Sequence, residues 1–83
     1  MSSIYTEDYL RVIRLLRQAR IDSGISQQQL ADVLKRPPSF IAKIEHGERR
    51  LDFVELIQLA RLLNIDPISL IERVQQDLQP IIG

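Results

Sequence analysis

ISQQQLADVLKRPPSFIAKIEHG, residues 25–47, is the stretch of this 83-residue chain that decides its fold. Ser26 and Gln29 have the spacing of a capping box, in which each side chain bonds the other residue's backbone N–H at the start of a helix. The residues after this box follow at helical spacing and form one apolar face: Leu30, Ala31 and Leu34. The stretch therefore begins with a short amphipathic helix.

The second half of the stretch predicts another short helix after a tight connection. Pro38 suits the first turn of a helix, and each residue of the Pro37-Pro38 pair disfavours helical backbone at the residue before it. Ile41 and Ile44 supply a buried stripe, and Gly47 can adopt the left-handed conformation that ends a helix. The remaining side chains of this helix are expected to face elsewhere: Ser39, Phe40, Ala42 and Lys43. Two such helices form a helix-turn-helix, whose second helix can enter the major groove of DNA.

Three further helices are predicted outside this stretch. The first runs from about residue 6 or 7 to residue 23, with an apolar face formed by Tyr9, Val12, Ile13, Leu16 and Ala19. Asp52 and Glu55 form a second capping box, and Asp66-Pro67 starts the last helix in the favoured order of cap then proline. The fourth helix has apolar residues around much of its circumference, so we expect it to be the most buried helix. These residues are Val54, Leu56, Ile57, Leu59, Ala60 and Leu63.

The chain shows no internal repeat and no strand-like alternation of polar and apolar residues. A length of 83 residues suits one small domain. The sequence therefore predicts a single all-α domain over residues 1–83, with five helices and a helix-turn-helix at about residues 26–47.

Composition argues against several classes of function. The chain has no cysteine and one histidine, His46, so we expect no disulfide, no zinc site and no cofactor. No nucleophile, base and orienting residue form a recognisable set, so we expect no enzyme. No signal peptide is visible at the N-terminus, and the apolar tract at residues 53–63 is too short and too polar to span a bilayer. These features predict a cytoplasmic protein that does not enter membranes.

Charge is distributed unevenly along a chain whose net charge is zero. Residues 35–50 hold five basic and two acidic residues, whereas residues 51–83 hold two basic and five acidic residues. This asymmetry fits a basic DNA-binding face and an acidic back. The alternative is an accidental asymmetry of solvated charges.

Three segments carry a resemblance to a known family: SQQQLADVL, SFIAKIEHG and GERRLDFVELIQLARLLNID. Together with Leu16, Ala19, Arg20 and Gly24 they cover roughly residues 10–71. In this order and spacing the chain resembles the Cro/lambda-repressor-like helix-turn-helix regulators, the XRE family. The resemblance implies a five-helix, lambda-repressor-like fold that binds double-stranded DNA.

Carried over residue by residue, the resemblance implies three groups of functional side chains. Lys43 is expected to read a base, and Ser39 a base edge or a phosphate. Phe40 either packs partly against the neighbouring turn or meets a thymine methyl, and it is assigned with them to base reading. The residues expected at the DNA backbone are Gln27, Gln28, Lys35, Arg36, Arg49 and Arg50. Arg20 and Glu45 are expected to form a structural ion pair.

The chain departs from the family pattern at Arg36 and at Pro37-Pro38. A small apolar residue followed by a serine or threonine cap is commoner there. Pro38 has no backbone donor and no side chain that can read a base. We therefore expect sparse direct readout, with more weight on Lys43, Ser39 and DNA shape.

Apolar residues near the C-terminus predict a homodimer. The last helix and tail carry more apolar surface than one packing face can cover, which is typical of an interface. Within residues 67–83 we assign Ile68, Ile71, Val74, Leu78 and Ile81 to the dimer surface. Leu70 and Ile82 are further apolar residues of the same helix and tail. Two-fold pairing would place the two recognition helices about 34 Å apart and predicts a palindromic operator.

The leading hypothesis is a sequence-specific transcriptional regulator, a repressor or controller, that acts as this homodimer. The chain leaves no room for a ligand-binding or protease domain, so DNA is the expected partner and no small molecule is expected. The alternative is a protein-interaction adaptor or antitoxin-like protein with the same fold. A monomer whose last helix closes the core is the alternative to the dimer.

Overall fold

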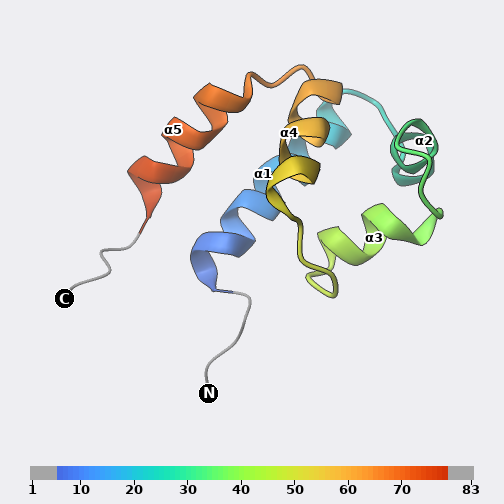
Figure 1. Cartoon of the computed structure of the whole chain (residues 1–83), viewed down its shortest axis with the longest axis horizontal. Helices are drawn as coiled ribbons and strands as arrows, with labels where there is room; N and C mark the ends of the chain where they lie inside the picture. Colours follow the sequence, from blue (N-terminus) through green and yellow to red (C-terminus); the bar gives the residue numbers. More distant parts are fainter. Residues whose placement is uncertain (1–5, 79–83) are drawn as a thin grey trace.

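The computed structural model describes residues 6–78, which form five α-helices and no strand. The helices are α1 (Glu7–Asp22), α2 (Gln27–Val33), α3 (Ser39–Glu45), α4 (Phe53–Leu62) and α5 (Pro67–Asp77), in this order along the chain (Figure 1). The prediction of an all-α fold with a helix-turn-helix at α2 and α3 is confirmed.

Four of the five helices begin at a side-chain cap. Each capping side chain accepts a hydrogen bond from a backbone N–H two or three residues later, at 2.7–3.4 Å. The capping residues are Thr6, Ser26, Asp52 and Asp66. Helix α3 differs, because its cap is Pro38 and no side chain caps it. Its first turn is held by the Phe40 N–H, which donates to the Pro37 carbonyl at 2.9 Å.

Helices α1 to α4 end in the same backbone motif. Two residues beyond each C-cap, an N–H donates to the carbonyl five residues earlier, at 2.7–3.2 Å. The residue between cap and donor has a positive φ: Gly24 (72°), Lys35 (57°), Gly47 (79°) and Asn64 (59°). Glycine suits this backbone and asparagine tolerates it, whereas lysine is strained there. The left-handed Lys35 is therefore set by the turn and not by its own preference.

This strain predicts that Lys35→Gly stabilises the domain. Glycine relieves a left-handed strain of about 1–2 kcal/mol, offset in part by its larger entropy in the unfolded chain. We expect a net gain of about 0.5–1 kcal/mol, or a few degrees in melting temperature. Thermal melts followed by circular dichroism measure it, with Asn64→Gly as a control that should gain less. A Lys35→Gly variant that melts below the parent would contradict this interpretation.

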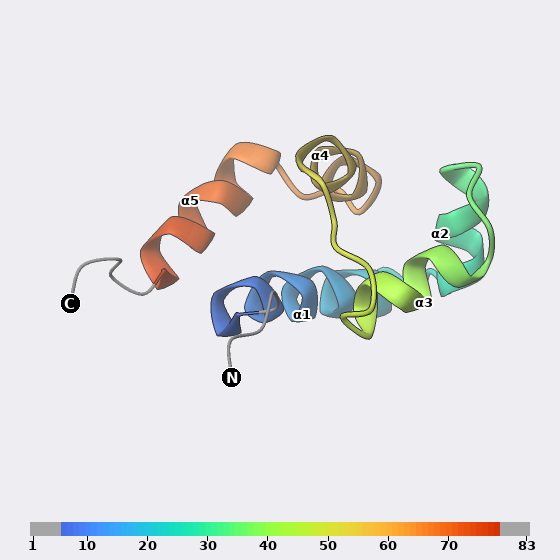
Figure 2. The ribbon, with the colours of Figure 1, turned by 60° about the horizontal axis from the view of Figure 1, so that its bottom comes forward.

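The helices enclose one core. Helix α2 packs on α3, α4 packs on α5, and α1 contacts both α3 and α5. Figures 1 and 2 place α2 and α3 at one end of the molecule and α5 at the other. The buried apolar side chains are Ile13, Leu16, Leu30, Ala31, Phe40, Ile41, Ile44, Leu59, Ala60, Leu63 and Leu70. The helix-turn-helix is thus one end of a continuous core and not a separate hairpin.

The expectation that α4 would be the most buried helix is wrong. Glu55, Leu59 and Ala60 are its only buried residues, and α1 and the shorter α3 bury as many. Phe53 is 69% exposed and Val54 is 56% exposed. Apolar residues surround α4, but its neighbours among the described residues cover only one side of it.

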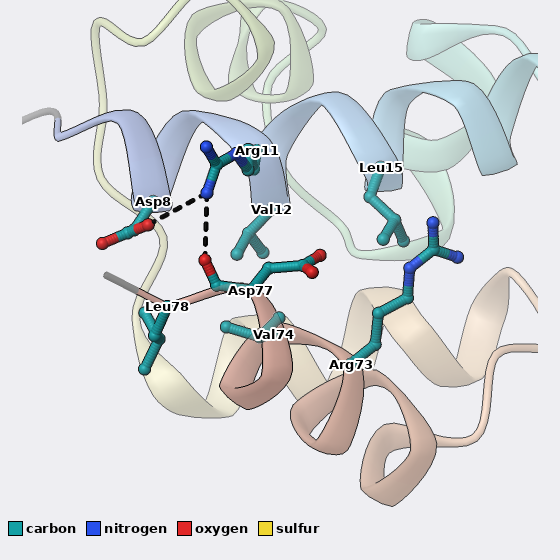
Figure 3. Close-up of a pocket in the computed structure, with 8 residues that line it drawn as sticks. All are labelled: Asp8, Arg11, Val12, Leu15, Arg73, Val74, Asp77 and Leu78. Carbon is teal, nitrogen blue, oxygen red and sulfur yellow. Dashed lines mark hydrogen bonds and ion pairs between the residues drawn. The ribbon is translucent and has the colours of Figure 1, made fainter. Parts of the chain in front are cut away.

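Helix α5 uses part of its apolar surface within the monomer. Leu70 is buried, and Val74 packs against the core beside Val12 and Leu15 of α1 (Figure 3). The Arg11 guanidinium donates to the Asp77 carbonyl at 3.0 Å and ties the end of α5 to α1. Leu70 and Val74 lie four residues apart on the face of α5 that packs inward, so the monomer already covers part of the apolar surface of this helix.

Candidate nucleic-acid interface

One face of α3 is open to solvent. Ser39, Lys43 and His46 are exposed and lie at i, i+4 and i+7, which is one side of a helix. Within residues 6–78, neither Ser39 nor Lys43 has a side-chain hydrogen bond or ion pair, whereas His46 lies 3.6 Å from Glu48. Two of the three expected base-reading residues therefore lie on a surface that a ligand can reach.

Phe40 does not belong to this surface. Its side chain is buried, with 6% of the residue exposed, so the assignment to base reading is corrected. It stands next to Ile41 and Ile44 on the inward side of α3, and a ring of its size is more stable in the core than in water. The guanidinium carbons of Arg36 and Arg49 lie 4.8 Å and 4.7 Å from its ring centroid. The turn before α3 and the loop after it thus meet at one aromatic ring.

A buried ion pair holds one flank of α3. Arg20 of α1 donates from Nε and Nη2 to the two carboxylate oxygens of Glu45, at 2.7 Å and 3.1 Å. The two side chains are 10% and 6% exposed. Arg20 also donates to the Ile25 carbonyl at 2.8 Å. This is the pair that the family resemblance implies, and it joins α1, the connection to α2 and the end of α3.

Gln27 belongs to the same cluster. Its side-chain amide donates to Glu45 at 2.8 Å, and the Arg17 guanidinium lies 3.8 Å from the same carboxylate. A primary amide has two N–H donors, so one remains for a ligand. Gln28, the next residue, is exposed. The start of α2 is thus tied to the end of α3, with Gln27 partly used by the protein itself.

A second carboxylate holds the other flank. Glu55 of α4 is 6% exposed and accepts two hydrogen bonds from Arg49, each at 2.9 Å. Arg36 donates to it at 3.4 Å. The hydrogen bond from Arg49 holds the pKa of Glu55 below its ordinary value against the opposing effect of burial, and the same bond raises the pKa of Arg49. Both shifts favour the ionised pair at neutral pH.

The two remaining basic residues differ in their surroundings. Lys35 is exposed at its left-handed position and has no side-chain partner among residues 6–78. The Arg50 guanidinium lies over the ring of Tyr9, 5.1 Å from its centroid. The Tyr9 hydroxyl accepts the Leu51 N–H at 2.9 Å. Helix α1 therefore supports the loop that carries Arg49 and Arg50.

Known proteins that resemble this chain in sequence and in structure share its helix-turn-helix. The family model described as helix-turn-helix matches residues 16–70, more than half of the chain. A solved structure of an XRE-family like protein from Pseudomonas syringae pv. tomato str. DC3000 superposes with a TM-score of 0.83. The two sequences are 37% identical, over 92% of this chain and 93% of the other. The chain belongs to the XRE family of helix-turn-helix proteins. No curated protein sequence matches it significantly.

Membership of the XRE family supports a role as a DNA-binding transcriptional regulator and argues against a role as an enzyme. In the part of the chain that the structure describes, no group of acidic and histidine side chains could hold a metal ion. None of the helices there is both long and apolar enough to cross a membrane.

The sequence did not predict the roles that two residues of this XRE domain have in the structure, Glu55 and Tyr9. Glu55 was interpreted only as half of a capping box, and Tyr9 only as part of an apolar face. Glu55 carried a usable signal, because a lone acid inside the apolar tract of residues 53–63 needs a cationic partner if the fold buries it. Tyr9 carried none, because its partners lie more than 40 residues away.

Proposed function

We propose that this protein regulates transcription by binding a specific double-stranded DNA site with α3 in the major groove. The observation that carries the proposal is the open face of α3, fixed on one flank by Glu45 and on the other by Glu55. A helix held this rigidly can present side chains to base edges at little cost in entropy. Lys43 lies at the centre of that face and suits the acceptors of guanine.

The basic residues around α3 are proposed to hold the DNA backbone. Lys35, Arg36, Arg49 and Arg50 come from the segments before and after α3, and Gln27 and Gln28 from the start of α2. Each phosphate that such a group neutralises releases counterions and steepens the salt dependence of binding. The acidic excess of residues 51–83 would then lie away from the DNA.

We propose that the regulator acts as a homodimer through α5. Ile68 and Ile71 lie one turn apart on α5 and are 68% and 46% exposed, and Leu78, the C-cap of that helix, is 51% exposed. Their apolar surface would be covered by the same stripe of a second copy, as in a two-fold interface. Ile81, also assigned to this surface, lies outside the described residues. A palindromic operator with half-sites about 34 Å apart follows from such symmetry, and repression or control by promoter overlap is the simplest mode of action.

A salt titration on random duplex DNA tests the function. We expect log K to fall linearly with log salt concentration and with a slope of several units, because several phosphates are contacted. Selection from a random pool should then yield a palindromic sequence. Absence of DNA binding at low salt would contradict the proposal.

That negative result would favour a second function, a protein-interaction adaptor or antitoxin-like partner. Two exposed apolar surfaces give this alternative some support: Phe53 and Val54 on α4, and the stripe on α5.

Lys43→Ala is expected to reduce affinity for the selected operator by about 1–3 kcal/mol and for unrelated DNA by much less. The reason is that a base contact contributes only where the correct base is present. Binding isotherms on both DNAs measure the difference. Lys35→Gln, proposed to lose a phosphate contact, should weaken both more evenly. Equal losses on both DNAs for Lys43→Ala would reassign Lys43 to the backbone.

A further inference from the structure

Glu55 gathers three segments of the chain at one buried carboxylate. Its Oε1 accepts the Asp52 N–H at 3.0 Å and Arg49 Nη1 at 2.9 Å. Its Oε2 accepts Arg49 Nη2 at 2.9 Å and Arg36 Nη2 at 3.4 Å. A capping box needs only the first of these bonds. The other three bring the turn before α3 and the loop after it to the start of α4.

Phe40 provides the second support of the same two arginines. Both guanidiniums lie within 5 Å of its ring centroid, at a distance where the ring attracts a cation. The ring is itself buried among core residues, so its position is fixed. Arg36 and Arg49 are therefore restrained by an anion and by an aromatic ring, although their side chains are 47% and 36% exposed.

We propose that Glu55 and Phe40 are positioning residues that hold Arg36 and Arg49 as a preorganised pair of phosphate-binding cations beside the open face of α3. The proposal rests on the DNA-binding function proposed above. It deepens that function by assigning to two buried side chains a role that neither could perform by touching DNA.

Both arginines keep unused N–H donors with which they can bind phosphate. A guanidinium has five N–H donors. Arg36 uses one of them on Glu55, and Arg49 uses two on Glu55 and one on the Arg50 carbonyl. One carboxylate against two guanidiniums also leaves a net positive charge. The site therefore keeps donors and charge while the side chains lose freedom before DNA arrives, so less entropy is lost on binding.

Positioning and simple charge balance predict opposite effects for Glu55→Gln. This substitution removes a negative charge from the interface, so charge alone predicts tighter binding to DNA. Glutamine keeps the acceptor for the Asp52 N–H but bonds guanidiniums much less strongly than carboxylate does. If Glu55 positions the arginines, the same variant binds DNA more weakly in spite of its added positive charge.

The experiment measures affinity for random duplex DNA across a series of salt concentrations, for the whole chain. For Glu55→Gln we expect about tenfold weaker binding at low salt. The slope of log K against log salt concentration should be shallower by about one to two units, because fewer phosphates are neutralised. The matched control is Glu48→Gln, which removes the same charge from an exposed residue of the loop between α3 and α4. The control should bind as tightly as the parent or slightly more tightly. Glu55→Gln binding that equals or exceeds that of Glu48→Gln would overturn the proposal.

A double-mutant cycle with Phe40→Leu separates positioning from loss of fold. Leucine keeps the site apolar but removes the ring beneath the guanidiniums. Arg36→Gln should weaken binding about fivefold in the parent and less than twofold in Phe40→Leu or Glu55→Gln. Equal losses in all backgrounds would overturn the proposal, even if Glu55→Gln proves too unstable to assay. If the parent protein binds DNA but the Glu55 and Phe40 variants show none of these differences, the positioning proposal is wrong and the DNA-binding function stands. If the parent protein shows no salt-dependent DNA binding, both proposals are wrong.

Discussion

Glu45→Ala is expected to destabilise the domain by about 3–5 kcal/mol, the cost typical of breaking a buried ion pair. Without the carboxylate, two donors of Arg20 and the amide of Gln27 lose their acceptor in a site where the Arg20 side chain is 10% exposed. For a domain of this size the loss corresponds to a fall of more than about 12 °C in melting temperature. Thermal and urea unfolding followed by circular dichroism measure it.

Glu48→Ala is the matched control for this substitution. Its side chain is 62% exposed and approaches only His46, at 3.6 Å, among the described residues. We expect a change within about 0.5 kcal/mol, as for most surface substitutions. If Glu45→Ala melted within a degree or two of Glu48→Ala, the Arg20–Glu45 pair would not contribute to stability.

Ile71→Asp is expected to give the largest effect on DNA binding. It places a charge in the middle of the exposed α5 stripe, where the proposed two-fold interface would bury it without a partner. Loss of the dimer removes the second half-site contact, and bivalent attachment contributes about 10²–10⁴-fold in affinity. Light scattering should change from twice the 9.6 kDa chain mass to the mass of one chain, with a matching loss of operator affinity.

Ile71 is a better probe of the interface than Val74. Ile71 is 46% exposed, so a charge there need not disturb the monomer, whereas Val74 packs against α1. Val54→Asp adds the same charge to a 56% exposed residue of α4 and should leave the dimer intact. A parent protein of 9.6 kDa at micromolar concentration, with unchanged operator affinity in Ile71→Asp, would rule out the dimer.

The sequence by itself determined where the helices start and which residues form most of the core. Caps such as Ser26 and Asp52 act through bonds that span only three residues, so local spacing is enough to identify them. The stripe of Ile41 and Ile44 follows from the helical period, which the short chain segment imposes on its own side chains. The Arg20–Glu45 pair was anticipated only through family resemblance, since its partners are 25 residues apart.

Tertiary structure alone decided the details on which the proposed mechanism depends. Phe40 is buried because the fold packs its ring into the core and brings Arg36 and Arg49, from segments before and after α3, over that ring. Glu55 accepts hydrogen bonds from both of these arginines only because the fold places α4 next to them. Periodicity identifies the faces of a helix but not the neighbours that cover them, so the open side of α4 and the inward side of α5 could not be assigned in advance. Burial and ion pairing at these positions depend on contacts between distant segments, which the helical period of a single segment does not encode.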